Sequence, residues 1–205
     1  MIGRHGIGDL KFSYETAEAH EWYDPLKPYT KLEYEWVQAH VDYEGAIVAD
    51  VGCHHGNYAV VFKGAAHIIC VDQVRQFCDI CRRNLELNYA EPNTVIQARM
   101  GSGHGISSVT PYKPDVYKMD IEGTEFEMFP NEFNDNPQVH TWIIEIHPAQ
   151  GNPDDIARIF KGFKLLKVDR EQLAVVPYEI GSTWKTHATL IAKRFYPLER
   201  REDES

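Results

Sequence analysis

The stretch IVADVGCHHGNYAVV, residues 47–61, decides the fold of this chain. Its first five residues are apolar apart from Asp50, which is typical of a strand that is buried on both faces in a parallel sheet. Gly52 and Gly56 then bracket a turn, in which a main chain without Cβ can adopt positive φ and let a ligand approach. Asn57 is a candidate N-cap for a short helix ending near residue 62. The stretch therefore predicts a strand, a ligand-binding loop and a helix.

The spacing of the glycines distinguishes between nucleotide ligands. A dinucleotide loop, GxGxxG, would need glycine at position 54, where this chain has His54, and the pyrophosphate of NAD or FAD packs against that middle glycine. S-adenosylmethionine has no phosphate, so it needs a helix N-terminus only for its carboxylate. An acidic side chain can bind its ammonium. The pattern therefore favours S-adenosylmethionine over a dinucleotide. The alternative is a glycine turn that only packs a strand against a helix.

The composition fits one domain, with 205 residues of which 43% are hydrophobic and 25% charged. The chain has no run of ~18 apolar residues and its first residues lack the apolar core of a signal peptide, so we expect a cytoplasmic protein without a membrane partner. The formal net charge is −10 and no long Lys/Arg block occurs, which argues against nucleic acid as a partner. An RNA or DNA substrate would require a local basic groove.

The four cysteines are Cys53, Cys70, Cys78 and Cys81. Cys78 and Cys81 have the CxxC spacing of half a zinc site, which His67 and Cys70 could complete. However, Cys78 and Cys81 lie in a helical pattern and Cys70 lies in an apolar strand pattern. We therefore expect buried, reduced thiols and no metal site.

Strands and helices alternate along the chain, which predicts a mainly parallel sheet with helices on both faces. Strands are expected at residues 47–51, 67–72, 94–98, 115–121, 141–146, 163–169, 174–178 and 187–193. Helices are expected at residues 15–23, 31–40, 73–87, 154–160 and from 125 onward. Thr30 is a candidate N-cap for the helix at 31–40. Because no helix separates the last two strands, we expect them to form an antiparallel hairpin.

The domain is expected to cover residues 31–197. Residues 1–30 form an N-terminal arm or cap, and the charged residues 198–205 form a disordered tail. The loop GSGHG at residues 101–105 is either flexible enough to fold over a ligand or a simple linker.

Polar side chains recur where the predicted strands end. Asp50, Asp72, Asp120 and His147 all fall at the carboxyl ends of strands, and ligands bind at that edge in open α/β sheets. Asp72 lies 20 residues after Gly52, the distance at which a second-strand carboxylate can accept hydrogen bonds from ribose hydroxyls. The alternative for Asp72 is an exposed aspartate that starts the next helix.

Four segments carry a resemblance to a known family: EYEW at residues 33–36, VADVGCHHGNY, RRNLELN at residues 82–88, and KMDIEGTEFEMF at residues 118–129 followed by IIEIHP. Over residues 31–193 the chain resembles the FkbM-type family of S-adenosylmethionine-dependent methyltransferases. The resemblance implies the Rossmann-like class I methyltransferase fold, with a seven-stranded sheet whose last strand is antiparallel. It also implies a small-molecule acceptor, often a hydroxyl of a sugar, a lipid-linked glycan or a polyketide.

The chain departs from the family pattern in two places. Asp72-Gln73 stands where the family often has Glu-Pro, which puts the geometry of that loop in doubt. His54 and His55 replace small residues of the glycine loop, either as ligand contacts or as solvated turn residues.

These patterns predict a methyl-donor site and a reaction. The predicted donor-binding residues are Asp50, Gly52, Cys53, His54, Gly56, Asn57, Asp72, Gln73 and Asp120. His147 is the candidate general base, because an imidazole with an ordinary pKa near ~6.5 accepts a proton at neutral pH. Asp120 and Glu122 would orient the acceptor or the donor.

Several alternatives stay open. His147 could instead be a histidine hydrogen-bonded at a strand-to-proline turn. We expect the reaction to need no metal, and Asp120, Glu145 and His147 come nearest to a metal triad. The chain could also be a non-catalytic S-adenosylmethionine-binding module, a partner subunit, or an RNA methyltransferase with a basic patch beside its pocket.

Overall fold

An eight-stranded sheet forms the centre of the protein in the computed structural model, which describes residues 2–4, 7–13, 27–88, 90, 92–99, 108–184 and 188–194. The strand order is β5-β4-β3-β6-β7-β10-β8-β9. The strands are β3 (Ile47–Val51), β4 (His67–Asp72), β5 (Asn93–Gln97), β6 (Val116–Met119), β7 (Thr141–Ile146), β8 (Phe163–Asp169), β9 (Ala174–Pro177) and β10 (Ala188–Arg194). The predicted helix at 15–23, the GSGHG segment at 101–105 and the tail at 198–205 lie outside the described residues.

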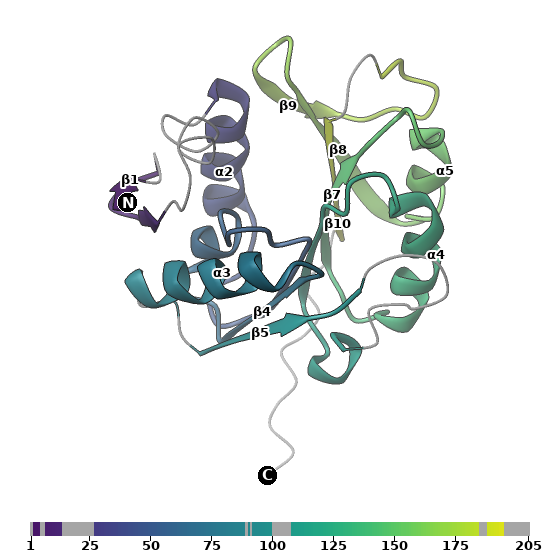
Figure 1. Cartoon of the computed structure of the whole chain (residues 1–205). Helices are drawn as coiled ribbons and strands as arrows, with labels where there is room; N and C mark the ends of the chain where they lie inside the picture. The colour runs from purple at the N-terminus through teal and green to yellow at the C-terminus, as the bar shows by residue number, and fades with distance from the viewer. Residues whose placement is uncertain are drawn as a thin grey trace.

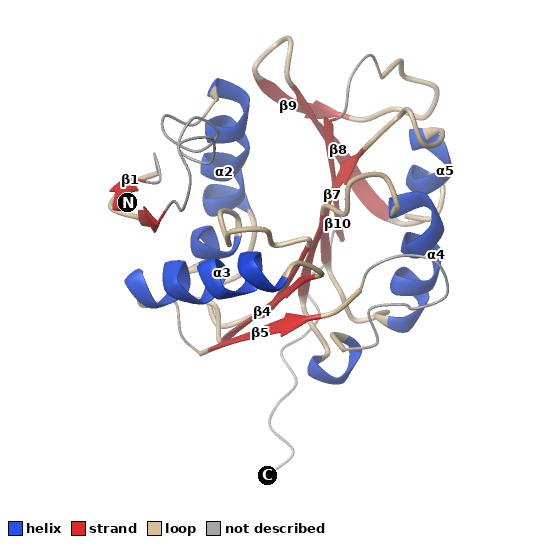
Figure 2. Ribbon diagram, in the orientation of Figure 1, coloured by secondary structure: helices blue, strands red, loops and turns tan. Residues whose placement is uncertain are grey.

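Helices cover both faces of this sheet, as the alternation of elements predicts (Figures 1 and 2). On one face lie α2 (Pro28–His40), the 3₁₀ turn η1 (Ala59–Phe62) and α3 (Arg75–Leu87). On the other lie η2 (Thr110–Tyr112), α4 (Glu125–Asp135) and α5 (Pro153–Ala157). None of the described helices is both long and apolar enough to cross a membrane.

The central strands are parallel, and only the last strands reverse direction. β3 pairs in parallel with β4 and β6, and β6 pairs in parallel with β7. β10 is antiparallel to both β7 and β8, which agrees with the predicted antiparallel last strand. The resemblance implies seven strands, whereas this sheet has eight, with β9 at its edge beside β8.

The predicted hairpin of the last two strands is wrong. β9 pairs antiparallel with β8, and β10 passes back to lie between β7 and β8. The physical reason is burial. Leu190, Ile191 and Ala192 are fully buried, which a central position in the sheet provides, whereas the side chains of β9 are half-buried and suit an edge.

Two predicted helix caps also differ from the structure. α2 begins at Pro28, so Thr30 lies inside the helix, and proline is well suited to this first turn because its missing N–H needs no partner there. Asn57 caps no helix, because its side chain instead donates a hydrogen bond to the hydroxyl of Tyr34 (2.6 Å).

Alternate residues of each central strand feed two separate hydrophobic cores. In β3, Val48 packs with α2 and α3, whereas Ala49 and Val51 pack on the other face with α4 and α5. Trp142 is fully buried in this second core and stacks on Tyr117. The near-continuous apolar strands of the sequence therefore reflect burial on both faces.

A small sheet of β1 (Ile2–Arg4) and β2 (Lys11–Ser13) docks onto α3 through two buried asparagines of the RRNLELN segment. Asn88 accepts a hydrogen bond from the amide of Lys11 and donates one to its carbonyl, both at 2.8 Å. Asn84 accepts from the amide of Ser13 (2.6 Å) and donates to the carbonyl of His55 (2.7 Å). The two side chains thus satisfy the free edge of β2 as a neighbouring strand would.

We predict that Asn88→Ala releases this small sheet from α3. The change removes both part-buried hydrogen bonds to Lys11, at a cost of about 0.5–1.5 kcal/mol each. Amide hydrogen exchange at residues 11–13 should accelerate while exchange in β3 and β4 stays slow. Asn93→Ala is the matched control, since the side chain of Asn93 donates a hydrogen bond to the carbonyl of Ala90 (2.9 Å) and not to the small sheet. Unchanged exchange at residues 11–13 in Asn88→Ala would contradict the docking role.

Candidate functional site

The loop after β3 is held against the ends of neighbouring elements at its two glycines. Gly52 has φ +76°, and a Cβ placed there would lie 1.6 Å from the carbonyl oxygen of Asp120. Gly56 also has φ +76°, and its Cβ would lie 2.8 Å from Sγ of Cys81. Any side chain at either position would therefore force the loop away from β6 or α3.

Asp72, at the end of β4, anchors the same loop from the side. Its carboxylate is buried and accepts hydrogen bonds from the backbone amides of His54 (2.9 Å) and Val74 (2.8 Å). One side chain thus joins the glycine loop to the start of α3. Asp72 lies at the predicted strand end, but it is only 5% exposed, so the alternative of an exposed aspartate is wrong.

A buried ammonium lies under the loop. Nζ of Lys118 is 3.2 Å from a carboxylate oxygen of Asp50, 3.7 Å from one of Asp120 and 3.3 Å from the carbonyl oxygen of Gly52. Burial acts to lower the pKa of Lys118, but the two carboxylates outweigh it and raise that pKa above its ordinary value. Burial raises the pKa of Asp50, against the pull of Lys118. Sequence reasoning missed Lys118, although a lysine in the buried strand VYKM signals a paired charge.

Glu125 and His147 form a second polar unit. Glu125 is fully buried, and one of its oxygens accepts from the amides of Ile121 and Gly123 (3.2 Å each) and lies 3.0 Å from Nδ1 of His147. The hydrogen bond to Glu125 raises the pKa of His147 to about 9. The predicted ordinary pKa of His147 is therefore wrong, because a buried carboxylate stabilises the imidazolium. The other ring nitrogen lies 3.6 Å from Glu122.

Asp120 lies between these two units. Burial raises the pKa of Asp120 to about 7, with Lys118 opposing and Glu145 adding to the rise. A carboxyl group with this pKa is partly protonated at neutral pH, whereas an ordinary aspartate is almost fully deprotonated. Sequence reasoning assigned Asp120 to donor binding and to orienting the reactants, and did not consider it as a base.

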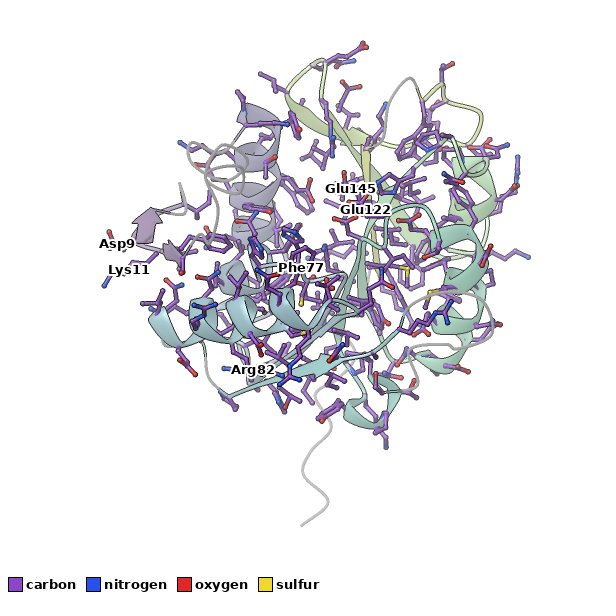
Figure 3. All side chains as sticks on the ribbon, in the orientation of Figure 1. Asp9, Lys11, Phe77, Arg82, Glu122 and Glu145 are labelled. Atoms are coloured by element: carbon purple, nitrogen blue, oxygen red, sulfur yellow. The ribbon has the colours of Figure 1, made fainter. Side chains whose placement is uncertain are left out.

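A cavity of about 430 Å³ joins the glycine loop to the ends of β6 and β7. Figure 3 shows Glu122 and Glu145 close together at this edge. The residues lining the cavity are Lys27, Tyr29, Thr30, Glu33, Tyr34, Gly52, Cys53, His54, Asn57, Tyr58, Lys118, Asp120, Glu122, Glu145, His147 and Arg170. Burial, with Lys118 adding to it, lowers the pKa of His54 to about 4, so its imidazole is neutral at the wall.

Helix α2 provides the opposite wall. Glu33, in the EYEW segment, is buried and accepts hydrogen bonds from Tyr58 (3.0 Å) and from Thr189 of β10 (2.8 Å). Arg170 pairs with Glu145 (2.7 Å) across the cavity wall. None of these three contacts could be predicted from the sequence, because each joins residues that are distant in the chain.

The structure brings most of the predicted site residues together. The cavity includes Gly52, Cys53, His54, Asn57, Asp120, Glu122 and His147. Four predicted donor-binding residues do not line it: Asp50, Gly56, Asp72 and Gln73. Asp50 lies beneath the loop on Lys118, Gly56 faces Cys81, and Gln73 is exposed.

Ligand atoms of Asp120, Glu122 and His147 lie within 4.8 Å of one another, so this edge of the cavity could hold a cation. Glu122 stands in this trio where the sequence analysis named Glu145. Nδ1 of His147 is hydrogen-bonded to Glu125 (3.0 Å), so Nε2, which lies 3.6 Å from Glu122, is the ring nitrogen at this edge.

No protein-family model matches this chain, and no curated protein matches it. Solved structures do match. The chain is similar to the putative methyltransferase yhhF from Escherichia coli, with a TM-score of 0.59, 11% identity, and coverage of 95% of this chain and 99% of that one. It is also similar to magnesium protoporphyrin IX methyltransferase from Synechocystis, solved with bound S-adenosylmethionine, with a TM-score of 0.55, 16% identity, and coverage of 81% and 79%.

A third similar structure is a putative tRNA (m1A22) methyltransferase from Streptococcus pneumoniae, with a TM-score of 0.54, 16% identity, and coverage of 82% of this chain and 72% of that one. At these identities the likeness establishes the fold, which is that of S-adenosylmethionine-dependent methyltransferases.

We predict that Glu125→Gln lowers the pKa of His147 from about 9 toward its ordinary value near ~6.5. The glutamine oxygen can still accept from the amides of Ile121 and Gly123 but carries no charge to stabilise an imidazolium. NMR titration of the ring protons measures the midpoint, and His140, which contacts Thr141, serves as the internal control. A wild-type midpoint near ~6.5 would contradict the assignment.

The same pair makes stability depend on pH, since the folded pKa of His147 lies above its unfolded value. Its contribution is full below pH ~6.5 and is lost as pH rises through about 9. The difference in unfolding free energy between wild type and Glu125→Gln should shrink over that window.

Proposed function

We propose that this protein is an S-adenosylmethionine-dependent methyltransferase that methylates a hydroxyl on a small molecule or sugar. The observation that carries the proposal is that one cavity contains both the glycine loop and the acid-base groups at the ends of β6 and β7. A donor held on the loop and an acceptor beside Asp120 would then meet within the same cavity.

The residues at the loop suit the methionine end of the donor. Gly52 and Cys53 of the loop line the cavity, and Asp120 and Glu122 offer carboxylates to an ammonium group. Asp72 already accepts from two backbone amides, so any contact to a ribose would use the remaining lone pairs of its carboxylate. When bound, S-adenosylmethionine supplies an activated methyl group on a sulfonium.

The pKa values of His147 and Asp120 support different roles for these two groups in the reaction. With a pKa of about 9, His147 is protonated at neutral pH and positions groups as an imidazolium. Asp120, with a pKa of about 7, is partly deprotonated at the same pH and is the group we propose to accept the hydroxyl proton. This revises the prediction that His147 is the base.

The charges of the cavity favour a neutral acceptor over a phosphate-rich one. Its carboxyl groups belong to Glu33, Asp120, Glu122 and Glu145. Of the cationic side chains at the wall, Lys118 pairs with Asp50 and Arg170 pairs with Glu145. A polyol with several hydroxyls could bond to these carboxylates, whereas RNA phosphates would be repelled.

The FkbM-type assignment is part of this proposal. Its segments fall at the functional places of the fold: EYEW provides Glu33, KMDIEGTE provides Lys118, Asp120 and Glu125, and IIEIHP provides His147. We also infer a cytoplasmic location, in keeping with the four free, buried cysteines.

We predict that Asp72→Ala weakens binding of S-adenosylhomocysteine, the demethylated product, by about ten- to a hundredfold, because it removes the charge-assisted hydrogen bonds that hold the loop. Isothermal calorimetry provides the measurement. Asp79→Ala is the matched control, an exposed aspartate of α3 that pairs with Arg82. Equal affinity in Asp72→Ala and wild type, or tighter binding of NAD than of the sulfur nucleotide, would refute the donor site.

We predict that Asp120→Asn lowers kcat by about 10²–10⁴, because the variant lacks a proton acceptor. The acceptor is first found by transfer of labelled methyl from S-adenosylmethionine into fractionated metabolites and glycans. In wild type, kcat should then rise with pH through about 7, the pKa of Asp120. Glu127→Gln, an exposed change on α4, should leave both kcat and its pH profile intact.

The outcomes separate the candidate functions. A rise of kcat through pH about 9 would return the role of base to His147. Loss of turnover on adding a chelator, with rescue by Mg²⁺, would make Asp120, Glu122 and His147 metal ligands. Donor binding without transfer to any fraction would favour the binding module, and transfer to RNA would favour the RNA methyltransferase.

A further inference from the structure

Three of the four cysteines meet in the core behind the glycine loop. Ligand atoms of Cys53, Cys70 and Cys81 all lie within 4.8 Å of one another, and each residue is at most 3% exposed. They come from three different elements: the glycine loop, β4 and α3. The sequence does not predict that these three cysteines meet, because the only cysteine motif in it is the CxxC spacing of Cys78 and Cys81.

The fourth cysteine does not belong to this group. Sγ of Cys78 donates to the carbonyl oxygens of Asp72 (3.6 Å) and Ile96 (3.7 Å). His67 lies 2.9 Å from the hydroxyl of Thr94, through its Nε2. Of the four zinc ligands considered from the sequence, Cys70 and Cys81 belong to this group, and Cys53 joins them.

We propose that Cys53, Cys70 and Cys81 form a binding site for one thiophilic divalent cation of the zinc type, behind the glycine loop. Zinc–thiolate bonds of about 2.3 Å place sulfur atoms about 3.8 Å apart, so a shift of about 1 Å brings the cluster to ligand geometry. Binding replaces the thiol protons, which are released to solvent. The carbonyl oxygen of His54, 3.8 Å from Sγ of Cys53, lies beside the cluster.

Charge favours a divalent ion over Cu⁺. Three thiolates with Zn²⁺ carry a net charge of −1, whereas the same thiolates with Cu⁺ carry −2. Cys70 lies directly opposite Asp50 in the register of β3 and β4, so added negative charge would be buried next to a carboxylate.

Cys53 also lines the cavity proposed for methyl transfer, so the test of this cation site uses no activity. Reduced, full-length protein is titrated with Zn²⁺ against a chromophoric chelator, and we expect one ion per chain. Titration with Cd²⁺ then reports the number of thiolates on the ion through its ultraviolet charge-transfer absorption, with three expected. This second measurement needs no variant, so misfolding of a variant cannot obscure the result.

The variants Cys53→Ser, Cys70→Ser and Cys81→Ser should each weaken Zn²⁺ binding by more than about 100-fold, because each removes a direct ligand. Cys78→Ser is the matched control, a buried cysteine on the same helix as Cys81, and it should bind Zn²⁺ as wild type does. Absence of Zn²⁺ binding by the folded, reduced protein would overturn the proposal. So would a Cd²⁺ signal from fewer than three thiolates, or equal loss of binding in Cys78→Ser.

Discussion

The buried ion pair of Lys118 and Asp50 is the interaction on which the rest of the site depends. Residues of β3 and β6 lie opposite each other at this point, so both side chains enter the face covered by α2 and α3. An unpaired charge there would be strongly destabilising, so neither side chain is tolerated without the other. The same ammonium reaches Asp120 and the carbonyl of Gly52 and thereby joins the end of β6 to the glycine loop.

Environment, more than residue type, decides the acid-base roles at this edge of the sheet. A histidine is the usual base at neutral pH, but the buried carboxylate of Glu125 holds His147 as an imidazolium. An aspartate is usually too weak a base, yet burial brings the pKa of Asp120 to about 7. The exchange of roles that we propose for His147 and Asp120 rests on contacts between different strands and loops, which cannot be predicted from the order of residues.

The sequence predicted those parts of the fold that depend on local pattern. The bounds of β7 and β8 agree to the residue, because apolar runs between turn residues define them. The parallel direction of β3, β6 and β7 follows from the crossovers. The position of β10 between β7 and β8 was missed, since burial and not turn length selects it. Asn84 and Asn88 were read only as part of a motif, because a buried asparagine looks in sequence like an exposed one.

One row of side chains across the sheet supports the glycine loop at both of its glycines. Cys70, Asp50 and Lys118 lie in one row across β4, β3 and β6, because residues in register point to the same face. At one end of the row, Gly52 lies against Asp120 over the Lys118 ammonium; at the other, Gly56 lies against Cys81 over the sulfur cluster. Each glycine is required because the backbone carbonyl of Asp120 or the sulfur of Cys81 already occupies the space a side chain would take. Events at either end of this row, a proton gained by Asp120 or an ion bound by the cysteines, would act on the same loop.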